Sequence, residues 1–133
     1  MDIGKIFEFE YKSRTDSKPR LILLGESEDM MVGVNLNYIH RRFRDQIVRF
    51  INNEMLRSFK LNEDVTQRIL DTNKIISERE FMRVFVMSSS GFSNEIVGKQ
   101  TIKSKTTLSK ILYGGFRLYK KEKLKNLKEI SYK

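Results

Sequence analysis

The chain has 133 residues, which is enough for one domain with a hydrophobic core but too few for two domains. It contains no cysteine, so disulfides, thiol nucleophiles and thiolate metal sites are excluded. The net charge of +9 arises in the last part of the chain: residues 1–96 contain fifteen Lys and Arg against fifteen Asp and Glu, whereas residues 97–133 contain eleven against two. This basic end predicts a polyanionic partner, which could be nucleic acid, an acidic protein surface or a membrane surface.

The first residues lack the basic region and apolar stretch of a signal peptide. The longest purely apolar run covers residues 21–24, which is too short for a membrane span. We therefore expect neither a signal peptide nor a transmembrane segment.

Residues 1–36 predict a β-meander. In residues 3–11, Phe7, Phe9 and Tyr11 alternate with glutamates, as in a strand with one buried face. Pro19 then precedes the apolar run "RLILLG", which is typical of a central strand, and "MMVGVNL" predicts a third strand. Gly33 inside that strand indicates a bulge or a sharp bend, so the meander is expected to curl.

Residues 37–87 predict helices. Asn37 is positioned to cap a long helix that extends to about Phe59, "LNED" begins a second helix, and the capping-box spacing of "SERE" begins a third. We expect one hydrophobic core to join the sheet to the long helix. Its predicted members are Phe7, Phe9, Leu21, Leu23, Val34, Phe43, Ile47 and Phe50.

The remaining residues predict short elements and a basic end. Residues 88–119 are expected to form a short strand at 92–99, a helix that ends at Gly114 and Gly115, and a strand at "FRLYK". The apolar residues of 120–133 recur at helical steps, which predicts a basic C-terminal helix. The predicted fold is α+β: a single domain, 1–133, with a small curled antiparallel sheet or partial barrel packed against a long helix.

Arginines near the start of the long helix form one candidate site. Arg41, Asp45 and Arg49 have the i, i+4 spacing of a surface ion-pair ladder, each pair of which contributes about 0.2–0.5 kcal/mol. Arg42 and Arg44 have no such partner and lie where free backbone N–H groups bind phosphate. The sequence leaves open whether these arginines form a phosphate site or an ordinary solvated helix face.

The lysine-rich end gives the strongest functional signal. Its aromatic residues Tyr113, Phe116 and Tyr119 alternate with cations, a mixture that proteins use to bind single-stranded nucleic acid. In the alternative interpretation the aromatic residues belong to the core and the lysines keep the protein soluble. The candidate nucleic-acid or phosphate ligands are Arg41, Arg42, Arg44, Lys110, Arg117, Tyr119, Lys120, Lys121, Lys123, Lys125 and Lys128.

The sequence offers little for catalysis. His40 is the only histidine, and without an evident orienting partner or further ligands we interpret it as a residue near a helix cap. Glu8 and Glu10 could bind a cation, but outward charges on an edge strand explain them more simply. We expect no catalytic residues, no metal and no cofactor.

The segments "IGKIFEFEYKSR", "KPRLILLG" and "VGVNLNYIHRRFR" resemble a family of short, poorly characterised proteins of large tailed bacteriophages. The similarity covers residues 3–50, weakens after residue 60 and returns around "ILYGGFRLYKKEKLK". The positions that carry it are Gly4, Phe7, Phe9, Tyr11, Pro19, Gly33, Asn35, Tyr38 and Arg42. The chain departs from the family in Asn37, where relatives tend to have His, and in a shorter turn before Pro19.

A second resemblance is to the small-barrel ribonuclease toxins of toxin–antitoxin pairs. Those enzymes also open with a glycine, an alternating strand, a polar loop and an Arg-Pro-led apolar strand. Here Pro19 precedes Arg20, and the downstream Thr or Ser of those enzymes has no match.

From these resemblances we expect a non-enzymatic accessory protein of a tailed phage that docks into the virion and contacts other phage structural proteins. The alternative is a nucleic-acid-binding protein that contacts DNA or RNA through its basic end, and an endoribonuclease toxin is the third possibility. The expected location is the virion or the host cytoplasm.

Overall fold

The computed structural model describes residues 2–12, 16–86, 102 and 104–131. The first three strands form the expected meander: β1 (Ile6–Tyr11), β2 (Arg20–Glu26) and β3 (Met30–Asn35). Two strands from the end of the chain, β4 (Phe116–Lys120) and β5 (Leu124–Ile130), add to its opposite edges. All neighbours are antiparallel and the order is β4-β3-β2-β1-β5.

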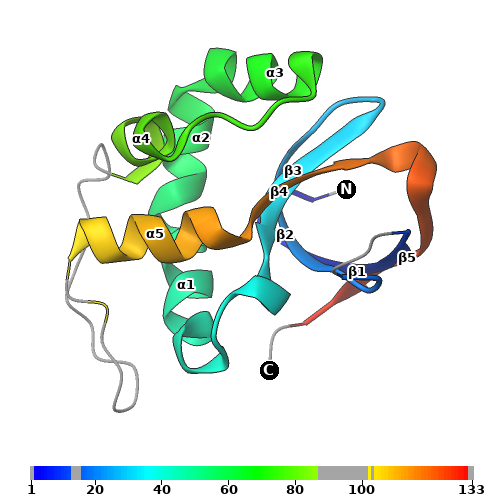
Figure 1. Ribbon diagram of the computed structural model, residues 1–133, viewed down its shortest axis with the longest axis horizontal. Helices are drawn as coiled ribbons and strands as arrows, with labels where there is room; N and C mark the ends of the chain where they lie inside the picture. The colour runs from blue at the N-terminus through cyan, green and yellow to red at the C-terminus, as the bar shows by residue number, and fades with distance from the viewer. Residues whose placement is uncertain (1, 13–15, 87–101, 103, 132–133) are drawn as a thin grey trace.

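The sheet is strongly curled but does not close. Although two strands separate β1 from β4, the rings of Phe9 and Tyr119 lie 5.3 Å apart, and the Lys120 N–H of β4 donates to the Tyr11 hydroxyl of β1 at 3.2 Å. The 3-10 turn η5 (Lys121–Lys123) carries the chain across the opening from one edge strand to the other (Figure 1). This arrangement confirms a mixed helix and strand fold with a curled antiparallel sheet.

Glycine permits a close approach between β2 and β3. A Cβ atom on Gly33 would lie 2.1 Å from the Ile22 carbonyl oxygen, closer than any side chain can approach. The register between β2 and β3 shifts between Leu23 and Gly25, next to this contact. The irregularity expected at Gly33 therefore falls on its partner strand.

Helical segments make up most of the described residues between β3 and β4, and they gather on one side of the sheet (Figure 1). Two 3-10 turns, η1 (Leu36–Tyr38) and η2 (Arg41–Phe43), precede α1 (Arg44–Phe50), the π-helical stretch η3 (Ile51–Met55) and α2 (Leu56–Leu61). The following elements are α3 (Glu63–Thr72), α4 (Glu78–Phe81), η4 (Met82–Val86) and α5 (Lys105–Gly115). Among the described residues, no helix has the length and apolar character needed to cross a bilayer.

The helix boundaries follow from their caps. The Ser77 hydroxyl accepts the Glu80 N–H at 3.2 Å, which confirms the capping box expected at "SERE". The cap expected at Asn37 was wrong, because Asn35 accepts the Asn37 N–H and begins η1 instead. The chain therefore makes two 3-10 turns before α1 begins at Arg44, six residues later than predicted.

The apolar residues form two clusters on opposite faces of the sheet, so the expected single core was wrong. The larger one lies between the sheet and the helices and includes Val34, Ile47 and Phe50, with Phe43 only partly buried against it. The smaller one lies on the inner side of the curl. It consists of Phe7, Phe9, Leu21, Leu23, Met31 and Tyr119, with Tyr11 and Leu124 packed against them.

The predicted basic C-terminal helix at 120–133 was also wrong, since this segment contains η5 and strand β5. Leu124, Leu127 and Ile130 recur at helical steps, but Leu124 contacts the inner cluster and Ile130 contacts the helix-side cluster. Asn126, with φ of 56°, lies beside a register shift and allows the strand to change faces. Pairing with β1 satisfies backbone groups that would otherwise lie on an open sheet edge. The short strand expected at 92–99 lies outside the described residues.

Candidate nucleic-acid interface

The arginines at the predicted helix start are engaged in local contacts. Arg44 donates from Nε to the Ile39 carbonyl at 2.9 Å, and the Arg42 guanidinium lies 4.8 Å from the centre of the Phe43 ring. The Arg42 N–H, which a phosphate would need, donates to Nδ1 of His40. His40 thus caps η2, in agreement with the interpretation of it as a residue near a helix cap. The Arg49–Asp45 part of the predicted ladder is present at 3.3 Å.

The aromatic residues of the basic end belong to the hydrophobic clusters. Phe116 is 1% exposed and packs against Phe81 in the larger cluster, while Tyr113 donates its hydroxyl hydrogen to the Ile76 carbonyl at 2.7 Å. Tyr119 is 7% exposed in the inner cluster. The burial of Phe116 and Tyr119 agrees with the alternative interpretation, in which these aromatic residues belong to the core, and Tyr119, one of the candidate ligands, has little surface to offer a ligand.

Tyr119 instead joins the inner cluster to a group of polar side chains. Its hydroxyl oxygen accepts a hydrogen bond from Nδ2 of Asn35, which is fully buried, at 2.9 Å. Burial raises the pKa of Tyr119 to about 12, because the phenolate would lose its solvation there. The nearby Tyr38 and Asp16 raise this pKa further, whereas Asn35 and Arg117 lower it.

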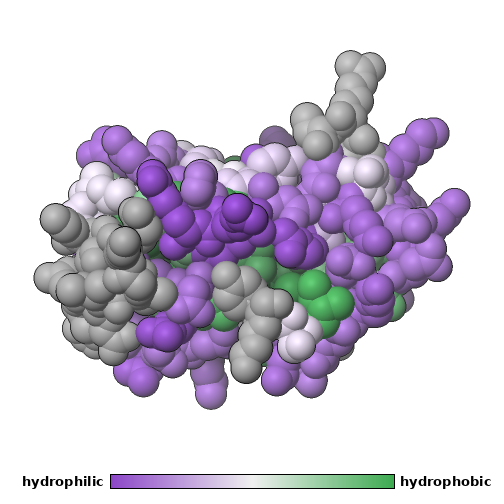
Figure 2. Space-filling model, turned by 90° about the horizontal axis from the view of Figure 1, so that it is seen from below, coloured by the Kyte–Doolittle hydropathy of each residue, from purple (hydrophilic) through white to green (hydrophobic). Residues whose placement is uncertain are grey.

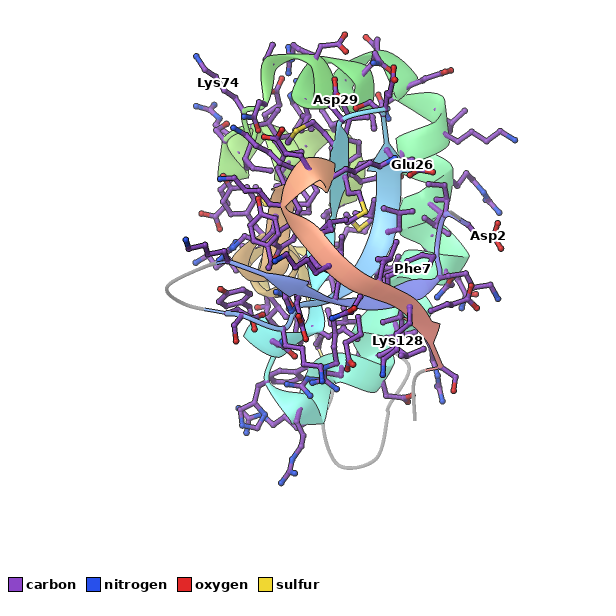
Figure 3. The ribbon with its side chains drawn as sticks, turned by 90° about the vertical axis from the view of Figure 1, so that its right-hand side faces the viewer. Asp2, Phe7, Glu26, Asp29, Lys74 and Lys128 are labelled. Carbon is purple, nitrogen blue, oxygen red and sulfur yellow. The ribbon has the colours of Figure 1, made fainter. Side chains whose placement is uncertain are left out.

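Two of the candidate lysines form ion pairs. Lys121 contacts Glu26 at 2.7 Å, and Lys128 contacts Glu8 at 3.4 Å. Partial burial raises the pKa of both glutamates, but their lysine partners outweigh this effect and leave each pKa below its ordinary value. Figure 3 shows β5 crossing in front of the curled sheet, with Lys128 on it and Phe7 on the neighbouring β1.

Two further lysines of the basic end, Lys123 and Lys125, line an open pocket of about 650 Å³ beside the opening of the curled sheet. The pocket is formed by the end of β1, the connection to β2, η5 and the start of β5. Its lining residues are Glu10, Tyr11, Lys12, Ser17, Lys18, Glu122, Lys123 and Lys125. Lys12, Lys123 and Lys125 make no ion pair with any carboxylate that the structure describes, so their charges remain available to a ligand.

Sequence reasoning missed half of this pocket. Tyr11, Lys12, Ser17 and Lys18 lie more than a hundred residues before Lys123 and Lys125, and they were interpreted only as a strand end and a polar turn. The available signal was the group of cations in "YKSRTDSKP". Only the pairing of β1 with β5 brings the two basic segments together.

The other predicted ligands lie apart from this pocket lining. Lys110 is exposed on α5, in the helical layer, and Arg41 is exposed on η2. The Arg117 guanidinium lies 4.4 Å from the centre of the Tyr38 ring and donates to the Phe116 carbonyl. Lys120 ends β4 and binds Tyr11 through its backbone.

A polar group fixes the chain segment that carries Ser17 and Lys18. Asp16 Oδ2 accepts hydrogen bonds from Nδ2 of Asn35 at 2.7 Å and from Nδ2 of Asn37 at 2.9 Å. Asn37 also donates to the Lys18 carbonyl at 2.9 Å and accepts from Nε of Arg20 at 2.8 Å. These contacts join the β1–β2 connection to the end of β3.

Within the described residues, no group of three or more His, Asp and Glu side chains is arranged to hold a metal ion. Seen from below, the coloured surface is mostly hydrophilic, and its most prominent hydrophobic area lies near the middle of this face (Figure 2).

Comparisons of this chain with family models, with curated proteins and with solved structures gave no match.

Proposed function

We propose that this chain is a non-enzymatic binding protein that holds a single strand of nucleic acid in the basic pocket between the β1–β2 connection and the start of β5. The observation that carries the proposal is the convergence of Lys12, Lys18, Lys123 and Lys125 on one concave surface. Two carboxylates, Glu10 and Glu122, line the same pocket, so its lining residues carry a positive net charge.

The chemistry of the lining suits a single strand better than a duplex. Lysine ammonium groups contact phosphates as point charges, and Ser17 offers a hydroxyl to a phosphate or a sugar. The Tyr11 ring is half-buried and lines the same surface, where an unstacked base can contact it. An open pocket of about 650 Å³ can admit part of a flexible strand, whereas a duplex is read by a protruding helix or β-ribbon that enters one of its grooves.

The proposal is tested by neutralising the two free lysines of η5 and β5. A Lys123→Gln/Lys125→Gln double variant should bind a fluorescent single-stranded oligonucleotide roughly tenfold more weakly at 0.1 M salt. Its slope of log K against log salt should be shallower by about 1.4, because each lost phosphate contact removes about 0.7. Both side chains are exposed, so the melting midpoint should change little.

The matched control is Lys74→Gln/Lys110→Gln, which removes the same charge from exposed positions of the helical layer. This control should retain its affinity and its salt dependence. Equal losses in both double variants would show that net charge, and not the pocket, drives binding. Deleting residues 120–133 is unsuitable as a test, because it removes the partner strand of β1.

The non-enzymatic part of the proposal has its own test. Purified protein incubated with labelled RNA and DNA should leave both intact. Cleavage that is lost on replacing Arg20 by Ala would favour an endoribonuclease instead. Arg20 is the residue to test, because its guanidinium is oriented by Asn37 in the same polar group as Asp16.

A virion-associated docking component of a tailed phage is the second candidate. The resemblance of residues 3–50 to phage proteins favours it, and β5 offers an exposed outer edge to a protein partner. Here the partner is another phage structural protein, and the location is the virion or the host cytoplasm. A docking component would show little affinity for oligonucleotides at physiological salt, and β5 substitutions would impair particle assembly.

A further inference from the structure

We infer that Asp16 is the positioning residue of the basic pocket: its carboxylate fastens the β1–β2 connection to Asn35 and Asn37, and so holds Ser17 and Lys18 at the pocket wall. The inference rests on the proposed function of this pocket. Asp16 itself does not line the pocket, so any effect on binding must pass through the segment that it holds.

The carboxylate of Asp16 bridges three segments. Oδ2 receives the two amide donors of Asn35 and Asn37, which come from the end of β3 and from η1. Oδ1 receives the backbone N–H of Lys18 at 3.2 Å. A carboxylate that accepts several hydrogen bonds from ordered donors is a stronger anchor than any single neutral contact.

The donors are themselves fixed. Asn35 is fully buried, and its Oδ1 accepts the backbone N–H groups of Arg20 and Asn37, so the amide can present only its Nδ2 to Asp16 and Tyr119. Asn37 is oriented by Arg20 and by the Lys18 carbonyl. In the contact between Asp16 and the two asparagines, Asn35 and Asn37 are therefore the fixed partners. The β1–β2 connection, which carries Asp16, is the segment that they hold in place.

Without Asp16, Lys18 keeps the hydrogen bond from Asn37 Nδ2 to its carbonyl at 2.9 Å and the ion pair with Glu8 at 3.6 Å, but the side-chain attachment of residue 16 to Asn35 and Asn37 is lost. The remaining backbone ties of the connection include Tyr11 N–H to the Ser17 carbonyl at 3.0 Å and Phe9 N–H to the Pro19 carbonyl at 3.3 Å. These bonds close the base of the connection but do not attach it to β3. Loss of the carboxylate should let Ser17 and Lys18 move away from Lys123 and Lys125.

The charge of Asp16 makes the inference unusually testable. Removing a negative charge beside a basic pocket should strengthen polyanion binding if electrostatics alone matters. Removing the Asp16 anchor should weaken binding, because part of the binding free energy must then offset the entropy lost when the ligand orders the β1–β2 connection. The two effects have opposite signs, so the direction of the change discriminates between them.

The experiment compares Asp16→Asn with Glu122→Gln, using the full chain and a fluorescent single-stranded oligonucleotide. Glu122 lines the pocket and is exposed, and its substitution should raise affinity by about twofold or less, because exposed charges are screened. Asp16→Asn should lower affinity by roughly three- to tenfold, the range expected for one lost hydrogen-bonded anchor. Asn37→Ala, which changes no charge, should lower affinity as well.

Hydrogen exchange gives a readout that does not depend on the ligand. In both Asp16→Asn and Asn37→Ala, the amides of Tyr11 and Lys18 should exchange faster, while the amides of the β2–β3 ladder stay protected. Unchanged exchange at Tyr11 and Lys18, or unchanged or tighter binding by both variants, would overturn the inference. A third outcome is faster amide exchange in the variants together with no oligonucleotide binding by the wild type. This outcome would support the role of Asp16 as an anchor but reject the proposed function.

Discussion

The two faces of the curled sheet are covered in different ways. The outer face carries the larger cluster, which helices cover and in which residues such as Phe81, Phe85 and Phe116 are almost completely buried. Among the described residues, six buried apolar side chains form the cluster on the inner face, and polar groups and the basic pocket adjoin them at the opening. This difference indicates that stability depends mainly on the helix-covered face, whereas polar and charged side chains adjoin the inner face at its opening.

Among the substitutions that test this comparison, Phe116→Ala should have the largest effect on the free energy of unfolding. Phe116 contacts Phe81 and Phe59 at the centre of the helix-covered face, and truncating a buried aromatic residue costs about 3–5 kcal/mol of unfolding free energy. Chemical denaturation gives the value. Phe43→Ala is the matched control, because Phe43 is only partly buried against the same cluster and should cost about half as much. Equal costs would remove the distinction between the centre and the rim of this core.

The burial of Tyr119 on the inner face can be tested by measuring the free energy of unfolding at alkaline pH. Its pKa is raised from the ordinary value of 10 to about 12 in the folded protein, so the folded state resists deprotonation more than the unfolded state does. The corresponding stability is fully present below pH 10 and is lost as the pH rises toward 12, by roughly 2 kcal/mol, since each pKa unit equals about 1.4 kcal/mol.

A Tyr119→Phe variant should lack this part of the alkaline loss, and at neutral pH it should be about 1 kcal/mol less stable, because Asn35 loses an acceptor. Identical alkaline profiles for the variant and the wild type would show that the inner face does not bury this hydroxyl.

The smallest expected effect on the free energy of unfolding concerns η5, the turn that crosses the opening of the curled sheet. The ion pair between Lys121 and Glu26 ties η5 to β2, and both side chains are about one quarter exposed. Glu26→Gln should therefore cost about 1 kcal/mol or less at pH 7. Because the pKa of Glu26 is lowered in the folded protein, this contribution is present above its ordinary value of 4.5 and is lost as the pH falls through the folded pKa.

The difference in unfolding free energy between the wild type and Glu26→Gln should accordingly shrink between pH 7 and about pH 3. A difference that stays constant over this range would show that the pair does not depend on the charge of Glu26.

Local patterns in the sequence were sufficient for much of the architecture. Alternation in residues 3–11, the apolar run after Pro19 and the capping box at Ser77 each predicted an element that the structure contains. These signals succeed because they depend on backbone hydrogen bonding and on burial within a few residues of the chain. The uneven charge is equally a property of the sequence, and it indicated the part of the chain that contributes Lys123 and Lys125 to the pocket.

The site itself could be predicted only in part. Lys123 and Lys125 were among the predicted ligands, whereas Tyr119 proved to be buried and Lys12 and Lys18 were not anticipated. No local pattern relates residue 12 to residue 125, because their proximity depends on a strand pairing between the two ends of the chain.

The sequence alone therefore determined the meander, the helical middle and the position of the excess charge, since each arises from neighbouring residues. Tertiary structure decided the rest. It made residues 124–130 a strand, because the open edge of β1 needs a hydrogen-bonding partner. The bulge at Asn126 lets Leu124 and Ile130 of this strand face opposite clusters. Tertiary structure also buried Tyr119, one of the aromatic residues that had suggested base stacking, because a curled sheet has an inner face to fill. Lysines on the solvent-exposed surface, such as Lys123 and Lys125, line the pocket instead.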